Sequence, residues 1–185
     1  MKTITIKAYT FQELPENIQD KVIDGFRYDQ EFHWSEDYIE SLKCALDFFN
    51  FELSNYNIDW NNFSGSDIRI KSRNDDEIDE LTGTRLYKYL INNFSTAKTK
   101  HGKVKTFEGN GAFTGFCADE DFLDPINEFL KKPSTKYNFH ELIEECASNL
   151  LLAGCNDFEY QQSDEAIIEM INFNNYYFDM DGYIV

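Results

Sequence analysis

The sequence predicts an α+β fold in one domain, 1–185, with a mixed or mainly antiparallel sheet that forms hairpins and is packed by about five to six helices. Helical periodicity and short alternating segments follow one another irregularly along the chain, which is typical of this class. A length of 185 residues suffices for a substantial core. The 17 Phe, 11 Tyr and 2 Trp supply the apolar area for that core.

The N-terminal part is predicted to contain one strand-like segment and two helices. MKTITIKAY alternates in the manner of a strand. Thr10 and Glu13 have the spacing of a capping box, Pro15 suits an early helical position, and the apolar stripe that follows predicts a helix to about Tyr28. A second amphipathic helix is predicted after Ser35.

The middle of the chain combines predicted strands with short helices. Two strands are expected, around 55–60 and 67–72, separated by the turn-like NNFSGS. NDDEIDELTGT predicts a short acidic helix interrupted near Gly83, and Thr84 is a candidate cap for the next helix. The stretch 98–118 predicts strands broken by the turns HG and GNG.

Three helices and a hairpin are predicted in the C-terminal part. Asp124 and Pro125 form a candidate N-cap and N1 pair for a helix that ends before Pro133. The clearest pattern predicts a helix over 139–153, stopped by Gly154.

The last residues continue this alternation of elements. DFEYQQ alternates as a strand does, and a helix is predicted after Ser163. Asp181 and Gly182 between NYYFDM and YIV predict a final hairpin.

The net charge of −17 is unevenly distributed. Residues 1–28 are neutral, 29–80 carry −10, 81–114 carry +5 and 115–185 carry −12. Such a charge argues against general affinity for nucleic acid or an anionic membrane, and it permits a basic partner.

The last 49 residues, 137–185, contain no lysine or arginine. Acidic residues on the solvent side of the helices predicted there, together with Glu159 in the alternating DFEYQQ, form a candidate surface for a cationic cleft. Repeated carboxylates on such a surface imitate the phosphates of a nucleic acid. Solubility and helix-dipole effects are the alternative explanation. The candidate partner-binding residues are Glu141, Glu144, Glu145, Glu159, Asp164, Glu165 and Glu169.

A basic segment, KTKHGKVK, interrupts the acidic sequence. It is the one place where the sequence allows contact with a nucleic acid backbone or with an acidic partner. Protection of an exposed edge strand against aggregation is the favoured explanation, because no aromatic residues interleave the lysines. The residues concerned are Lys98, Lys100, Lys103 and Lys105.

The sequence carries no catalytic, cofactor or metal signature. It lacks a phosphate-binding GxxxxGK[ST] loop, a GxGxxG opening a helix and a GxSxG elbow. His140 and Glu144 supply only two ligands, and a helix-surface pair is the simpler reading. Asp75, Asp76 and Asp79 have the chemistry for Mg²⁺, but their placement is typical of a solvated helix start.

The cysteines lack zinc spacing, so we expect buried, reduced thiols. They are Cys44, Cys117, Cys146 and Cys155. No apolar run approaches the roughly 20 residues of a membrane helix, and the N-terminus lacks the apolar core of a signal peptide. These features predict a cytoplasmic protein.

Three stretches carry a resemblance: YTFQEL before a helix, NNFSG after a strand, and EYQQSDEAIIEMINFNNYYFDMDG at the end. They resemble small acidic proteins of unassigned function from tailed bacteriophages and integrated bacterial elements, with the middle of the chain diffuse. Such proteins include inhibitors of host defence, among them anti-CRISPR proteins and restriction inhibitors. The resemblance implies no catalytic residues, and it implies a location in the host bacterial cell.

The leading hypothesis is therefore a non-enzymatic, anti-CRISPR-like inhibitor that binds a basic host protein, such as a CRISPR nuclease, through its acidic C-terminal surface. Two alternatives stay open. One is a metal-dependent nuclease acting on guide or transcript RNA, and the other is an antitoxin or regulatory binding partner. The sequence does not determine the oligomeric state.

Overall fold

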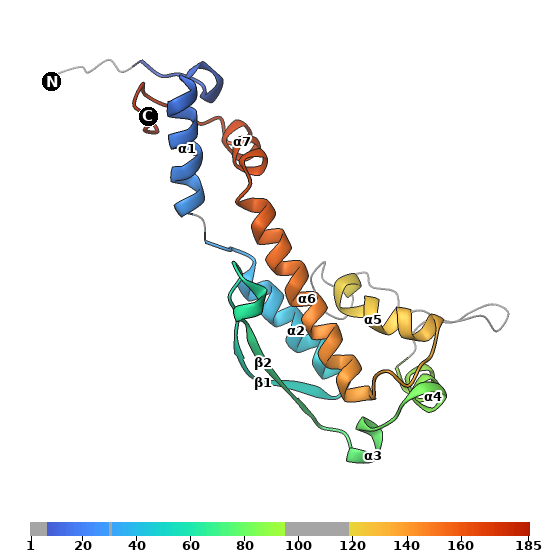
Figure 1. The fold of residues 1–185 in the computed structure, drawn as a ribbon. Helices are drawn as coiled ribbons and strands as arrows, with labels where there is room; N and C mark the ends of the chain where they lie inside the picture. Colours follow the sequence, from blue (N-terminus) through green and yellow to red (C-terminus); the bar gives the residue numbers. More distant parts are fainter. Residues whose placement is uncertain (1–6, 30, 95–118) are drawn as a thin grey trace. The chain divides into compact units, whose positions relative to one another are not determined.

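The computed structural model describes residues 7–29, 31–94 and 119–185, and these residues form seven α-helices and one two-stranded antiparallel sheet (Figure 1). The predicted α+β class with an antiparallel sheet is confirmed. The N-terminal strand falls mostly, and the hairpin predicted over 98–118 entirely, outside the described residues.

The contacts within the chain divide it into two compact units. Unit 1 comprises Met1–Phe32 and Asp157–Val185, and unit 2 comprises His33–Asn156. The boundary falls within one helix, α6 (Phe139–Gln161). The single domain predicted for 1–185 stays a prediction, which the number of unfolding transitions tests.

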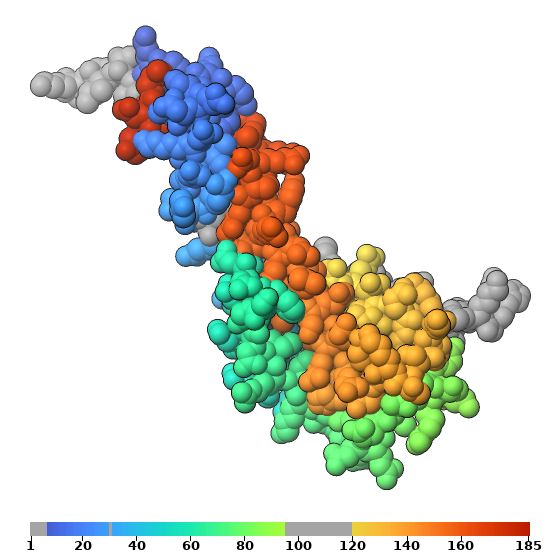
Figure 2. Space-filling model, in the orientation of Figure 1, coloured from blue at the N-terminus to red at the C-terminus, as the bar shows by residue number. Residues whose placement is uncertain are grey.

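Unit 1 is built from both ends of the chain. It contains α1 (Glu16–Asp29), α7 (Asp164–Phe173) and the C-terminal segment. The C-terminal residues lie against the N-terminal ones in the space-filling view (Figure 2). An antiparallel bridge joins Tyr9 to Phe178, with N–H···O distances of 2.8 and 2.9 Å. The core of unit 1 consists of Phe11, Leu14, Val22, Ile23, Ile167, Ile171 and Phe178.

The predicted capping box of unit 1 is present, but it begins a shorter element. The backbone N–H and the hydroxyl of Thr10 both donate to Glu13 Oε2, at 2.8 and 3.0 Å. The element is the 3-10 turn η1 (Phe11–Glu13), and Leu14 is extended because Pro15 follows it. The prediction of one continuous helix from Thr10 is therefore wrong.

Two further local predictions for unit 1 are confirmed. Ser163 Oγ accepts from the N–H of Ala166 and caps α7. The predicted turn at Gly182 has the required positive φ, +87°, and Phe178 forms an antiparallel bridge with Ile184.

Unit 2 places a β-hairpin beside helices. It contains α2 (Ser35–Phe48), β1 (Phe51–Asn57), the 3-10 turn η2 (Phe63–Gly65), β2 (Asp67–Ser72), α3 (Asp76–Asp79), α4 (Gly83–Asn93), α5 (Asp119–Lys131) and most of α6. β1 and β2 pair from Phe51↔Ser72 to Asn57↔Asp67, with a bulge between Leu53 and Asn55.

Two boundaries in unit 2 differ from prediction. β1 begins at Phe51, four residues before the predicted strand, because Phe51 is fully buried against Phe139. The N-cap of α4 is Thr82 rather than Thr84, since Gly83 takes a positive φ of +52° in a close approach to Thr135.

The helix predicted to start at Asp124 starts at Asp119, and Pro125 lies inside it. Pro125 has no N–H, so the carbonyl of Asp121 lacks its usual helical donor. Asn149 on α6 supplies a replacement, because its Nδ2 donates to that carbonyl at 2.5 Å. A tertiary hydrogen bond thus satisfies the carbonyl that the proline leaves without its helical donor.

We expect Asn149→Ala to lower the free energy of unfolding by about 1 kcal/mol, because the Asp121 carbonyl is half-buried and loses its donor. In a Pro125→Ala background the backbone N–H at position 125 is restored, so the cost of Asn149→Ala should fall by about half or more. Urea denaturation of the four proteins in a double-mutant cycle measures the coupling. An equal cost in both backgrounds would contradict this role of Asn149.

α6 continues past the predicted stop at Gly154 to Gln161, so the strand predicted over DFEYQQ is wrong. Gly154 is buried, and a Cβ there would lie 2.6 Å from Trp60 Cζ3. The glycine therefore permits close packing. The helical stripe continues through the buried Cys155 and Phe158.

Candidate functional site

The seven carboxylates predicted to bind a partner are all exposed. The structure places them in both units. Glu141, Glu144 and Glu145 lie on the first turns of α6 in unit 2, whereas Glu159 on α6 and the three acids of α7 belong to unit 1. The seven carboxylates therefore form two sets, one in each unit.

Three of the seven have partners in the structure. Glu141 forms a capping box with Asn138, with two hydrogen bonds of 2.9 Å. Glu144 Oε1 lies 3.5 Å from His140 Nε2, which confirms the predicted helix-surface pair. Asp164 forms an ion pair with Arg27 of α1, which also pairs with Asp24.

The other four carboxylates form no ion pair within residues 7–29, 31–94 and 119–185; they are Glu145, Glu159, Glu165 and Glu169. The negative charge of Glu145 interacts with the ammonium group of Lys136. The pKa of Lys136 is raised, mainly by its hydrogen bond with Tyr137 and to a smaller extent by Glu145.

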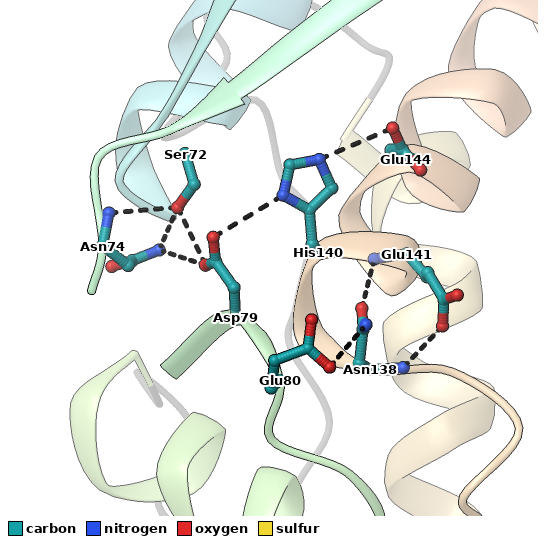
Figure 3. A network of polar contacts seen from close by, with 8 residues as sticks. All are labelled: Ser72, Asn74, Asp79, Glu80, Asn138, His140, Glu141 and Glu144. Carbon is teal, nitrogen blue, oxygen red and sulfur yellow. Dashed lines mark hydrogen bonds and ion pairs between the residues drawn. The ribbon is translucent and has the colours of Figure 1, made fainter. Parts of the chain in front are cut away.

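A polar network joins α3 to the start of α6 (Figure 3). Asp79 Oδ2 lies 3.6 Å from His140 Nδ1, and Asn138 Nδ2 donates to Glu80 Oε2 at 3.4 Å. Asp79 is mostly buried, with its side chain 15% exposed, and Oδ1 accepts from the hydroxyl of Ser72 at 2.8 Å. The network fixes the two elements against each other.

The contacts between α3 and α6 bring further acidic residues beside the predicted site, although the sequence alone did not assign them to it. The acids around α3 were interpreted as a solvated helix start, and Asp75, Asp76, Glu77 and Glu80 are indeed exposed. The structure places the elements that carry them beside the first turns of α6. We call this set the α3–α6 acidic surface: Asp75, Asp76, Glu77, Glu80, Glu141, Glu144 and Glu145.

The network contains serine, aspartate and histidine, but their order is not that of a nucleophilic triad. Ser72 Oγ donates to Asp79, so the carboxylate lies between the serine and His140. In a triad the imidazole takes the proton from the serine. The contacts fix the positions of Asp79 and His140, and they do not activate Ser72 as a nucleophile.

No group of three metal-ligating side chains occurs among the residues that the structure describes. Cys146 and Cys155 are buried as predicted, and burial raises the pKa of both thiols. Cys44 is exposed, because it falls outside the stripe of α2 that contains Leu42 and Ala45; the prediction of a buried thiol there is wrong. Cys117 lies outside the described residues, as do Lys98, Lys100, Lys103 and Lys105.

Within the described part of the chain, no helix has both the length and the apolar character needed to cross a membrane. Comparison with protein-family models, curated proteins and solved structures gives no match. Fold and site together define an acidic α+β protein in which a polar network joins two elements that carry exposed carboxylates.

Proposed function

We propose that this protein is a non-enzymatic inhibitor of the anti-CRISPR type, which binds a basic nucleic-acid-handling protein in the cytoplasm of a bacterial host cell. The observation that supports the proposal is the α3–α6 acidic surface. Its carboxylates come from two elements that the Asp79–His140 and Glu80–Asn138 contacts hold together.

Rigidity makes such a surface a good competitor for a cleft that normally holds DNA or RNA. Elements that a network holds together need little rearrangement on binding, so less of the interaction energy is spent on ordering them. Complementary charge accelerates encounter with a cationic cleft and selects against acidic partners. Both effects weaken with salt, as phosphate binding does.

The surface is tested by the triple variant Glu77→Lys, Glu144→Lys and Glu145→Lys, which leaves the capping box and Asp79 intact. We expect its affinity for the partner to fall by about tenfold or more, because like charges then face each other across the interface. The partner is first recovered by tagged pull-down from nuclease-treated host lysate, eluted with salt and identified by mass spectrometry. Added DNA or RNA should displace it.

Two further triple variants have the same change in net charge. Reversal of Glu16, Asp20 and Asp29, exposed residues of α1 in unit 1, should leave the affinity within about twofold, since none of them belongs to the α3–α6 acidic surface. Reversal of Glu159, Glu165 and Glu169 shows whether the carboxylates of unit 1 contribute. Equal losses in all three variants, or recovery of no basic protein, would refute the proposed surface. The nuclease and antitoxin alternatives stay predictions.

A further inference from the structure

A groove of about 560 Å³ lies in unit 2, away from the polar network, between α2 and the end of β1. Its lining combines aromatic, aliphatic and charged side chains. Those that matter here are Glu36, Ile39, Glu40, Lys43, Tyr56 and Trp60.

The two aromatic rings of the groove differ in how they are held. Tyr56 on β1 is 46% exposed. Trp60 is half-buried and packs on Tyr38, with ring centroids 5.7 Å apart. Gly154 of α6 lies directly against the indole, since a Cβ at that position would meet Cζ3. The indole of Trp60 therefore forms one wall of the groove, and its position is fixed before a ligand binds.

The charges of the groove favour a cation. Lys43, the only base among the lining residues, donates to Glu40 Oε1 at 2.6 Å and is neutralised by it. Glu36 is exposed and has no ion-pair partner among the described residues. A free carboxylate beside aromatic faces attracts a cation through charge and through the ring quadrupole.

We propose that this groove receives an arginine side chain of the basic partner, with the guanidinium against Tyr56 and Trp60 and paired with Glu36. Arginine fits because its planar, weakly hydrated guanidinium stacks on aromatic rings and donates two parallel hydrogen bonds to a carboxylate. The inference rests on the proposed function, since it specifies where such a partner inserts a side chain.

The test is a titration with the peptide acetyl-Ala-Arg-Ala-amide. The chain has two tryptophans, so Trp34→Phe makes Trp60 the only source of indole emission. We expect a saturable change in that emission. The same peptide with citrulline, the neutral isostere of arginine, should bind about fivefold more weakly or worse. Calorimetry on the chain with both tryptophans gives the affinities without relying on the Trp34→Phe variant.

Glu36→Gln and Tyr56→Leu, both at exposed positions, should each weaken the arginine peptide about fivefold, whereas Glu144→Gln on the α3–α6 acidic surface should not change it. Equal binding of the arginine and citrulline peptides, or indifference to both groove variants, would overturn the proposal. The titration needs no partner protein, so its failure leaves the pull-down result intact. A failed pull-down likewise leaves the groove result intact.

Discussion

Phe178→Ala is expected to lower the free energy of unfolding by about 3–5 kcal/mol, the cost of replacing a fully buried phenylalanine by alanine. Phe178 is central to unit 1, because its backbone pairs with Tyr9 while its ring packs with residues of α1 and α7. The cavity left by the ring therefore affects segments from both ends of the chain. Urea denaturation followed by circular dichroism measures the loss.

Phe173→Ala is the matched control, since Phe173 is 86% exposed. It should change the free energy of unfolding by no more than about 0.5 kcal/mol. Similar losses in the two variants would contradict the assignment of Phe178 to the core. The same curves test the domain prediction: one shifted transition indicates a single cooperative domain, and a shift in only one of two transitions indicates two.

Gly154→Ala is expected to destabilise the protein by about 2 kcal/mol, although alanine normally stabilises the middle of a helix. The added Cβ would lie 2.6 Å from Trp60 Cζ3 and 3.2 Å from Tyr38 Cδ1, so the rings or the helix must move. Thermal and urea unfolding measure the loss. A shift of the Trp60 emission should accompany it, because the indole is displaced.

Gly25→Ala is expected to have the opposite effect on stability. Gly25 lies within α1 and is exposed, and a Cβ there would have no atom within 4 Å. Only the helix propensity changes, so we expect a gain of about 0.5–1 kcal/mol. Stabilisation by both substitutions would show that Gly154 is not required for packing.

Only part of the acidic site could be predicted from the sequence. Exposure of six of its seven carboxylates followed from helical periodicity, which depends on positions three and four residues apart. Glu159 was expected to face outward from a strand, and it is exposed on α6 instead. The ion pair of Asp164 did not follow from periodicity, because its partner Arg27 is 137 residues away in the sequence. The contribution of α3 was also hidden, since the contact of Asp79 with His140 joins segments for which no local pattern exists.

Local signals by themselves determined the elements whose stabilising contacts lie within about one turn. The start of α2 near Ser35, the cap of α7 at Ser163 and the Gly182 turn all belong to this class. Each depends on an apolar period, a capping oxygen or a backbone conformation that few residues adopt.

The tertiary structure alone decided the roles of two residues that usually end or begin helices. Gly154 lies within α6 because Trp60 occupies the space of its missing side chain, and Pro125 lies within α5 because Asn149 donates to the carbonyl that the proline leaves without its helical donor. In both cases the competing local signal is worth about 1–3 kcal/mol, which packing and a replaced hydrogen bond are large enough to offset. Such partners are distant in sequence, and only the folded chain brings them together.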